Sequence, residues 1–443
     1  MAEGKSTIFA TPVNHADMIV TSSRHKSIPI ETTISDLPVN LVEEILSRVP
    51  LKNMREVRLT CKGWDTLSKS RSFSKMHIDK LSTVKEGESL IIAMVDYNLY
   101  LMTVVLGGTD EDPFVECQGR LTCLDKQIKI SQVFHCDGLL LCLSEDAILW
   151  NPYLGQTRSI EFPCTHCPHR WNRFTYALGY EEKGSSCRGY KLLRFIDIYD
   201  DYRPTHQYSC YEIYDFDSST WKTLDITPHW RIKFGLPGVS LKGNTYWPAS
   251  PRNIKENTLD DHMICFDFSS ESFGPLLRLP FDAGGDEGYA TLSSVREEKL
   301  AVLLTRNEVD PFECEIWVST KIEAEKVSWI KFLKVETEMG FNAMVDCVSF
   351  FIDEEKKVAM GYSETLNIVG EDGYLKELEL VERDGRDVNY CIPMVCSYVP
   401  SLVQIKQPSP GGQRKQRGDL EKLSQRYDQN MSRLAAIENR SSV

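Results

Sequence analysis

The amino-acid sequence predicts an α + all-β multidomain protein, in which a few short helices precede a large domain of strands. Three observations support this fold class. Apolar residues recur at helical spacing between residues 36 and 80. From 88 to 403, short apolar runs alternate with turn residues instead. These runs also recur in loosely similar units, which indicates a domain built from repeated small sheets.

The composition is that of an ordinary globular protein inside the cell. The chain has 443 residues, of which 42% are hydrophobic and 10% are aromatic. The longest apolar runs, such as Leu139 to Leu143, are far shorter than the roughly 20 residues that a bilayer requires. The N-terminus lacks the features of a signal peptide, and the 14 cysteines are scattered, which is typical of reduced thiols. We expect a cytoplasmic or nuclear protein that binds no membrane.

The net charge of −13 is unevenly distributed along the chain. Residues 35–80 carry nine Lys or Arg against six Asp or Glu, and residues 406–443 carry eight against four. Residues 81–405 therefore hold a net charge of −20. A domain this acidic repels phosphate backbones, so we expect no nucleic acid among its ligands.

The first ordered element is predicted to be a helix that follows a disordered leader. Residues 1–34 mix small polar residues with isolated charges and have no period. The helix should begin near Leu41, because Pro38 suits a helix start and Asn40 can cap it. Glu43 lies three residues after Asn40, where its carboxylate can reach back to the cap.

One side of this helix is strongly apolar. Leu41, Val42, Ile45, Leu46 and Val49 form one stripe that Pro50 ends. A second apolar series continues at Leu51, Met54, Val57, Cys61, Trp64 and Leu67. Two or three helices in about 40 residues rarely bury a core of their own. The stripe must therefore pack either on the β domain of the same chain or on another protein.

The β domain is predicted to be a propeller. Similar units begin near residues 135, 176, 238, 290 and 344, which is close to the roughly 50-residue period of a kelch-type blade. Four antiparallel strands with tight hairpins in each unit are what a propeller requires. A strict kelch repeat would have a glycine pair and spaced aromatic residues, which are missing here. A large β-sandwich or an irregular all-β domain is the alternative.

The C-terminal segment is predicted to be a linker followed by a short amphipathic helix. From 407 the composition is that of a linker. The motif "RKQR" at 414–417 has the composition of a nuclear import signal, but a solvated linker explains these four residues better. The apolar residues that follow are spaced at three and four positions: Leu420, Leu423, Tyr427, Met431 and Leu434.

Two stretches of the chain resemble known families. Residues 36–73, "DLPVNLVEEILSRVPLKNMREVRLTCKGWDTLSKSRSF", resemble an F-box at many positions with the expected spacing. The region from 88 to 403 resembles the F-box-associated (FBA type 1) interaction domain of plant F-box proteins. This second resemblance rests on "VFHCDGLLLCL", "LWNPYLGQTRSIE", "YALGY", "YEIYDFDSSTWKTLDITP" and "GVSLKGNTYW".

The residue patterns and the resemblance together divide the chain into four parts, and the resemblance implies a function in ubiquitin transfer. The parts are a leader (1–34), an F-box (35–80), an F-box-associated β-propeller-like domain (88–403), and a linker with a helical tail (404–443). The chain would be the substrate-recognition subunit of an SCF-type (Skp-cullin-F-box) E3 ubiquitin ligase. Its F-box would bind a Skp-type adaptor and through it a cullin scaffold, and its β domain would bind an unknown protein target.

The resemblance also assigns candidate residues. Cys61 and Trp64 would hold the core of the F-box together. The candidate adaptor contacts are Leu37, Pro38, Leu41, Ile45, Leu46, Val49, Pro50, Leu51, Met54 and Val57.

Aromatic and arginine side chains in or beside turns are the best candidates for target binding, because such anchors carry most interface energy. They are Trp171, Arg173, Trp230, Arg231 and Trp247, and each could instead pack in the core.

No motif indicates catalysis. The chain has no G-x-S-x-G elbow, phosphate-binding glycine loop or H-E-x-x-H pair, so we expect a non-catalytic protein. Two alternatives stay open: a Skp-binding adaptor that acts without the ligase, and a glycan-active propeller enzyme. Cys164, His166, Cys167 and His169 contain only half of the usual zinc pattern. We therefore expect a polar loop there, and no metal or cofactor.

Overall fold

The computed structural model describes most of the chain between residues 37 and 408. The described residues are 37–49, 53–68, 70–82, 88–107, 112–121, 129–144, 147–162, 174–184, 187–198, 208–232, 237–252, 262–280, 288–306, 312–337, 344, 347–381 and 394–408. The chain forms two compact units, residues 1–45 and residues 46–443. The predicted C-terminal helix lies outside the described residues.

Four short α-helices are described before the first strand. They are α1 (Val39–Leu46), α2 (Met54–Thr60), α3 (Lys62–Ser68) and α4 (Arg71–Ser82). Helix α1 begins earlier than predicted, because the carbonyl of Pro38 accepts hydrogen bonds from the amides of Leu41 (2.9 Å) and Val42 (3.1 Å). Asn40 therefore lies inside the helix and does not cap it. One residue with extended backbone, Cys61 (φ −159°), separates α2 from α3.

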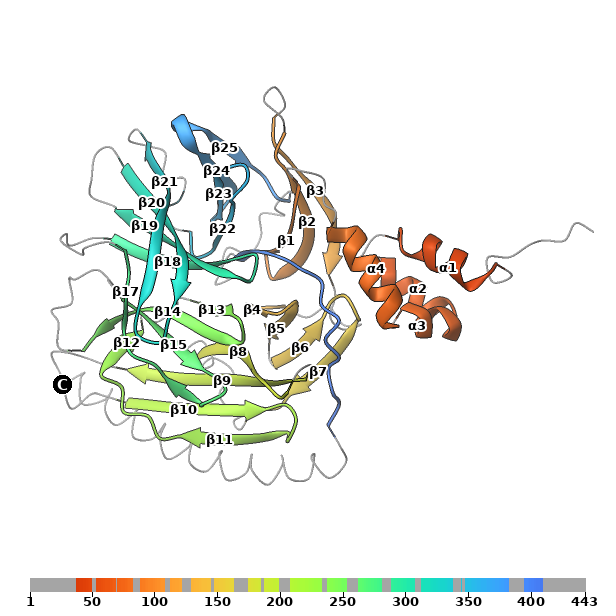
Figure 1. The fold of residues 1–443 in the computed structure, drawn as a ribbon, viewed down its shortest axis with the longest axis horizontal. Helices are drawn as coiled ribbons and strands as arrows, with labels where there is room; N and C mark the ends of the chain where they lie inside the picture. Colours follow the sequence, from red (N-terminus) through yellow and green to blue (C-terminus); the bar gives the residue numbers. More distant parts are fainter. Residues whose placement is uncertain are drawn as a thin grey trace, which may run out of the picture. The chain divides into compact units, whose positions relative to one another are not determined.

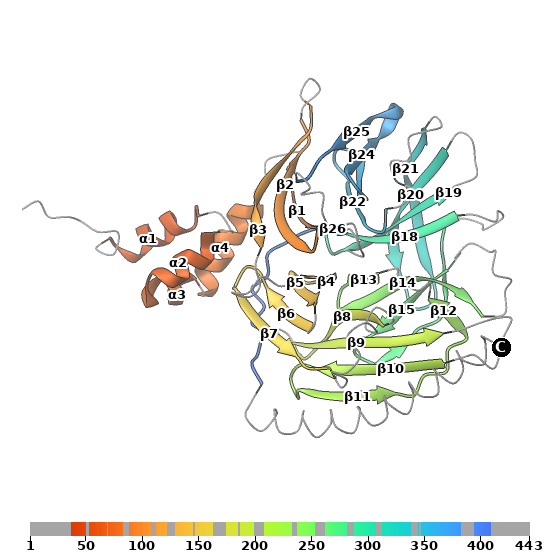
Figure 2. The same cartoon turned by 180° about the vertical axis from the view of Figure 1, so that it is seen from behind.

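The strands form six antiparallel sheets, which are the blades of the predicted propeller (Figures 1 and 2). Blade 1 contains β26 (Met394–Ser397), β1 (Glu88–Val95), β2 (Asn98–Val105) and β3 (Phe114–Leu121). Blade 2 contains β4 (Gln132–Cys136), β5 (Leu139–Leu143), β6 (Ala147–Asn151) and β7 (Gln156–Ile160). Blade 3 contains β8 (Thr175–Glu182), β9 (Arg188–Ile198), β10 (Tyr208–Asp215) and β11 (Thr220–Leu224).

The other three blades follow in chain order. Blade 4 contains β12 (Trp230–Ile232), β13 (Val239–Leu241), β14 (Asn244–Pro251), β15 (His262–Asp267), β16 (Ser272–Phe273) and β17 (Leu277–Arg278). Blade 5 contains β18 (Gly288–Val295), β19 (Lys299–Arg306), β20 (Phe312–Ile322) and β21 (Val327–Thr337). Blade 6 contains β22 (Phe350–Asp353), β23 (Val358–Tyr362), β24 (Leu366–Gly370) and β25 (Leu375–Leu378), with a 3-10 turn, η5 (Glu371–Gly373), between the last two.

Blade 1 combines strands from both ends of the domain. Strand β26 pairs with β1 in antiparallel register, with Ile91 opposite Ser397 and Met94 opposite Met394. One strand of each blade contacts its counterpart in the next blade, from β4 through β8, β13, β18 and β22 to β26. These strands therefore line the centre of the ring, and the C-terminal strand closes it.

The two ends of the blades differ in their connections. The turns 137–138 and 242–243, which join first to second strands in blades 2 and 4, are tight. Connections between blades, such as 161–174 and 338–349, are much longer. Because the strands of a blade are antiparallel, the turns that join first to second and third to fourth strands share one end. We call this end the tight-turn face.

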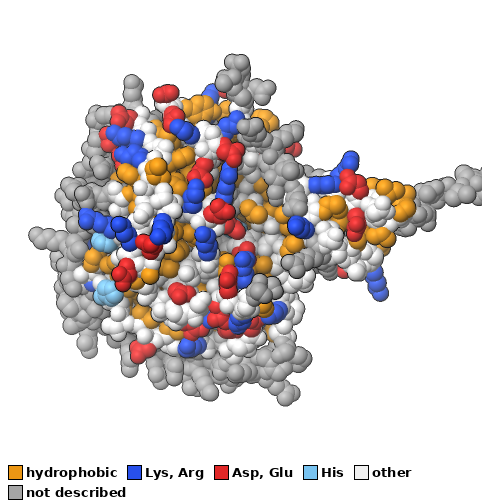
Figure 3. All heavy atoms as spheres, viewed as in Figure 1, with side chains coloured by type: hydrophobic (Ala, Val, Ile, Leu, Met, Phe, Trp, Pro, Cys, Tyr) orange, Lys and Arg blue, Asp and Glu red, His pale blue; other side chains and the backbone are white. Residues whose placement is uncertain are grey.

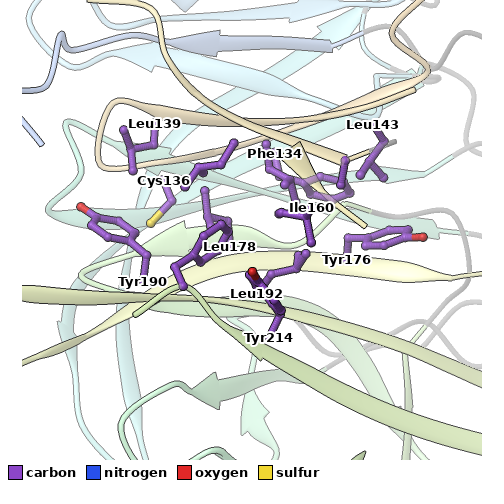
Figure 4. Close-up of a cluster of buried hydrophobic side chains, with 14 of the residues drawn as sticks. Phe134, Cys136, Leu139, Leu143, Ile160, Tyr176, Leu178, Tyr190, Leu192 and Tyr214 are labelled. Carbon is purple, nitrogen blue, oxygen red and sulfur yellow. The ribbon is translucent and has the colours of Figure 1, made fainter. Parts of the chain in front are cut away.

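The core lies between neighbouring blades. Figure 4 shows side chains of blades 2 and 3 that pack together, including Phe134, Ile160, Tyr176 and Leu192. Every residue of β5 is buried, as the unbroken apolar run Leu139–Leu143 requires of a strand that is covered on both faces. No helix among the described residues is long and apolar enough to cross a bilayer.

Candidate functional site

Helix α1 has an apolar side that is open to solvent. Leu41 and Ile45 are 46% and 40% exposed, and they lie four residues apart, on one face of the helix. Val42 and Leu46 are buried. Pro38 is exposed and Leu37 is half-buried. The apolar stripe predicted from the sequence therefore consists of a buried half and an exposed half, and Figure 3 shows hydrophobic side chains on the surface of the helical segment.

The other predicted contacts of this surface differ in exposure. Met54 is buried, whereas Val49 and Val57 are half-buried. Pro50 and Leu51 lie outside the described residues. Two exposed apolar residues, Val39 on α1 and Leu59 on α2, were not among the predicted contacts. Leu59 does not continue the periodic series of α2, so the search for an apolar stripe could not find it.

Cys61 and Trp64, which were predicted to form the core of the F-box, differ in burial. Cys61 is exposed, so its assignment to a core is wrong. The reason is its position between α2 and α3, where its Sγ accepts a hydrogen bond from the amide of Trp64 (3.5 Å). Trp64 is half-buried. Phe73 on α4, which was not predicted, is fully buried.

Helix α4 is joined to blade 2 through a buried tyrosine. The hydroxyl of Tyr153, in the turn between β6 and β7, lies 3.0 Å from Nδ1 of His77. Nε2 of His77 lies 2.9 Å from the carbonyl oxygen of Val49. A neutral histidine satisfies both contacts if Nε2–H donates to Val49 and Nδ1 accepts from Tyr153. Neither side chain is exposed.

The electrostatics of this junction keep His77 neutral. Burial lowers the pKa of His77, and the nearby charges of Arg58 and Lys80 lower it further, although the hydrogen bond to Val49 opposes them. Burial also raises the pKa of the Tyr153 hydroxyl. The guanidinium of Arg58 lies over the tyrosine ring, 5.7 Å from its centre. Arg58 thus packs against blade 2 and is not a freely solvated cation.

The turn that carries Tyr153 also holds the C-terminal segment. Nδ2 of Asn151 donates to the carbonyl oxygens of Ser401 (3.0 Å) and Val403 (2.8 Å). Nη1 of Arg158 donates to the carbonyl oxygen of Lys406 (2.7 Å). We call residues 401–407 the strap. The motif "NPYLGQTR" thus forms a turn that contacts both the strap and helix α4.

The residues predicted to bind a target are mostly not on the surface. Trp230 and Trp247 are 2% and 0% exposed, so their assignment as surface anchors is wrong. Both pack with Phe195, Tyr211 and Phe273 between blades 3 and 4. Arg231 points to the other side of the sheet, is half-buried, and donates to Oγ of Ser250 (2.9 Å). Trp171 and Arg173 lie outside the described residues.

A cluster of charged groups lies on the tight-turn face near the centre of the ring. His135 at the end of β4 faces Glu297 in the β18–β19 turn at 3.6 Å. Nε2 of His135 accepts a hydrogen bond from the amide of Gly138 (3.2 Å), and Asp137 accepts bonds from Arg188 and Tyr190. Burial lowers the pKa of His135 to about 4 and raises the pKa of Glu297 to about 7.

Metal ligands are not assembled in the part of the chain that the structure describes. No group of three or more His, Cys, Asp or Glu residues there could hold a metal ion. The cysteine- and histidine-rich segment 164–169 lies outside the described residues. The expectation of a polar loop at that segment stays a prediction.

Two protein families match the chain. The F-box domain matches residues 34–76, and the F-box associated beta propeller domain matches residues 90–405. An F-box/kelch-repeat protein of Arabidopsis thaliana is 52% identical over 422 residues, which cover 90% of this chain and 95% of that protein. An F-box protein and a putative F-box protein of the same plant are 51% and 49% identical, and each match covers 92% of this chain and 98% of the relative.

Proposed function

This chain belongs to the plant F-box proteins that carry an F-box associated β-propeller domain, and on this basis we propose that it is the substrate-recognition subunit of an SCF-type ubiquitin ligase. The F-box binds a Skp-type adaptor, which connects it to a cullin scaffold. The propeller binds the protein that is to be ubiquitinated. The chain itself performs no covalent step.

The exposed apolar side of α1 is the observation that supports this proposal most directly. Burying a Leu or Ile side chain stabilises a complex by roughly 1.5–3 kcal/mol. Leu41 and Ile45 leave close to half of their surface in water, and Val39 is 66% exposed. Such a patch on a short helix is typical of a protein-binding site, because isolated apolar side chains are usually scattered over a surface.

The contribution of such a protein to catalysis is effective concentration. A target held on the propeller meets the ubiquitin-loaded enzyme in an intramolecular encounter, which replaces a rare collision in solution. Six blades that bury their own apolar side chains give this target a rigid platform. The acidic propeller favours a target with a basic epitope.

Adaptor binding tests the proposal. The double variant Leu41→Ala with Ile45→Ala removes the exposed apolar side of α1, and alanine retains the helix. We expect the affinity for a purified Skp-type adaptor, measured by calorimetry, to fall roughly 100-fold. Ile330→Ala, which truncates a more exposed apolar residue on β21 (59%), is the control and should bind like the wild type. Unchanged binding by the double variant would remove the assigned surface.

Cullin recruitment distinguishes the proposed ligase subunit from an adaptor-binding protein that acts outside the ligase. The full-length chain with its adaptor should co-purify with a cullin, and the complex should transfer ubiquitin to proteins that the propeller captures. A stable adaptor complex that never takes up a cullin would support the second function instead.

A further inference from the structure

We propose that Tyr153 is a latch that fixes helix α4 of the F-box to blade 2, so that the F-box helices from α2 onward and the propeller move as one body. The latch consists of Tyr153, His77 and the carbonyl of Val49. This proposal rests on the proposed function, because α2, α3 and α4 belong to the F-box through which the chain would join the ligase.

The burial of Tyr153 is the first argument. A turn between two outer strands of a blade would normally be solvated. Instead, the ring of Tyr153 is completely buried, and its centre lies 5.6 Å from that of His77. His77 in turn packs on Phe73 of the same helix, at 5.7 Å. Helix α4 therefore supplies part of the core around this turn, and Ile78 of α4 packs against the same cluster.

The chain of hydrogen bonds is the second argument. Tyr153 bonds to His77 on α4, and His77 bonds to Val49 in the segment that follows α1. Three segments that are distant in the sequence thus meet at one imidazole. The hydroxyl of Tyr153 also lies 3.4 Å from the carbonyl oxygen of Ser74, so it contacts α4 at two points. Removing the hydroxyl leaves Nδ1 of His77 buried without this donor. These directional hydrogen bonds fix the orientation of α4 against blade 2. Apolar contacts alone would allow the helix to shift.

The anchoring of the turn is the third argument. Oδ1 of Asn151 accepts a hydrogen bond from the amide of Leu154 (2.9 Å), which fixes the turn locally. Nδ2 of the same residue holds the strap. Tyr153 therefore lies in a turn that Asn151 holds both internally and to the strap. A rigid support of this kind is what a positioning residue needs.

Hydrogen exchange on the free full-length chain tests the latch without any adaptor or target. The variant Tyr153→Phe keeps the ring and removes only the hydroxyl. We expect backbone amides of α4 between residues 73 and 78 to exchange about tenfold faster or more, because Nδ1 of His77 loses its partner. Amides of blade 5 should exchange at the wild-type rate. Tyr362→Phe, at a buried tyrosine of blade 6, is the matched control and should leave α4 unchanged.

A double-variant cycle separates a specific bond from general packing. His77→Leu alone should also speed the exchange of α4. The pair His77→Leu with Tyr153→Phe should be no faster than the faster single variant, because both ends of the bond are then absent. Independent effects that multiply would overturn the proposal. So would unchanged α4 exchange in Tyr153→Phe, or an equal acceleration over all six blades, which would make Tyr153 an ordinary residue of the propeller core.

Ubiquitin transfer provides a readout that simple packing would not move. Tyr153→Phe should bind the Skp-type adaptor with wild-type affinity, since Tyr153 lies outside the exposed side of α1. The lysines that become modified on a captured target should nevertheless spread over more positions. Wild-type protein that fails to bind adaptor would refute the proposed function and leave the exchange result standing. An identical lysine pattern in variant and wild type would refute the positioning role.

Discussion

The propeller buries its leucine side chains in β5, whereas the F-box helices leave some of theirs exposed. Leu139, Leu140 and Leu141 in β5 are fully buried, whereas Leu59 in α2 is 76% exposed. The propeller repeats one sheet six times, and each blade covers its neighbour. The short helices have no repeat to cover them. The difference teaches that neighbouring blades cover the apolar side chains of the propeller, while part of the apolar surface of the helices stays exposed, which is where we propose that the adaptor binds.

Removing the closing strand, β26, should cause the largest loss of stability. Deleting residues 394–443 removes β26 and leaves the edge of β1 unpaired. We expect the truncated protein to lose a cooperative thermal transition, a loss comparable with the whole stability of a domain, about 5–15 kcal/mol. Circular dichroism on heating checks this. The matched truncation of residues 409–443 keeps β26 and the strap and should melt like the full chain. Cooperative melting of the longer deletion would show that the ring is stable with only β1, β2 and β3 in blade 1.

The same substitution in the two regions should have opposite signs. A methyl group at Gly179 in β8 would lie 2.2 Å from Cδ2 of Phe268 and 2.4 Å from the carbonyl oxygen of Gly243. Because backbone blocks it, Gly179→Ala should destabilise the protein by about 3 kcal/mol or more. At Gly63 in α3 the nearest atom is 3.8 Å away, so Gly63→Ala should stabilise the helix by roughly 0.5–1 kcal/mol. Urea unfolding measures both, and equal signs would contradict the comparison.

Within the propeller, we expect stability to fall at acid pH because of the buried His135. The pKa of His135 is lowered to about 4, mainly by burial, so the folded state keeps this histidine neutral. The unfolded chain takes up its proton near pH 6.5, and stability is therefore lost as the pH falls from about 6.5 towards 4. The expected loss is roughly 3 kcal/mol, and His135→Gln should remove it. Urea unfolding at pH 7 and pH 4.5 measures the difference.

Glu297 faces His135 at 3.6 Å and provides the control for this experiment. Its carboxyl has a raised pKa of about 7, caused mainly by burial and then by the charge of Asp137. Stability from this group is present below about pH 4.5 and is lost as the pH rises through 7. Glu297→Gln should therefore stabilise the protein at pH 8 and have little effect at pH 4.5. Parallel pH profiles for both variants would refute the assigned directions.

Much of the fold was predictable from local patterns. The expected blade starts near 135, 176, 238, 290 and 344 correspond to the first strands β4, β8, β13, β18 and β22. Tight turns and apolar runs are local signals, so they can be read along the chain. No start was predicted for blade 1, because its strand β26 (Met394–Ser397) comes from the other end of the domain and pairs with β1. Four residues without periodicity carry no signal of a partner that lies about 300 positions away.

The functional residues were harder to predict, because exposure depends on what packs above a side chain. The periodic stripe on α1 was visible, but the pattern could not separate the buried Leu46 from the exposed Ile45. Trp230 looked like a loop residue because turn residues surround it, yet it lies in the short strand β12. Tyr153 gave no signal at all, since its partner His77 lies on a helix in the preceding domain.

The pairing of β26 with β1 also constrains how the protein is made. The F-box helices precede the propeller in the chain and β26 follows all other described strands, so the nascent chain passes through a period with an open ring. Until β26 is synthesised, the edge of β1 is unpaired, and strands of other chains could pair with it. The ring can therefore close only after β26 has been synthesised.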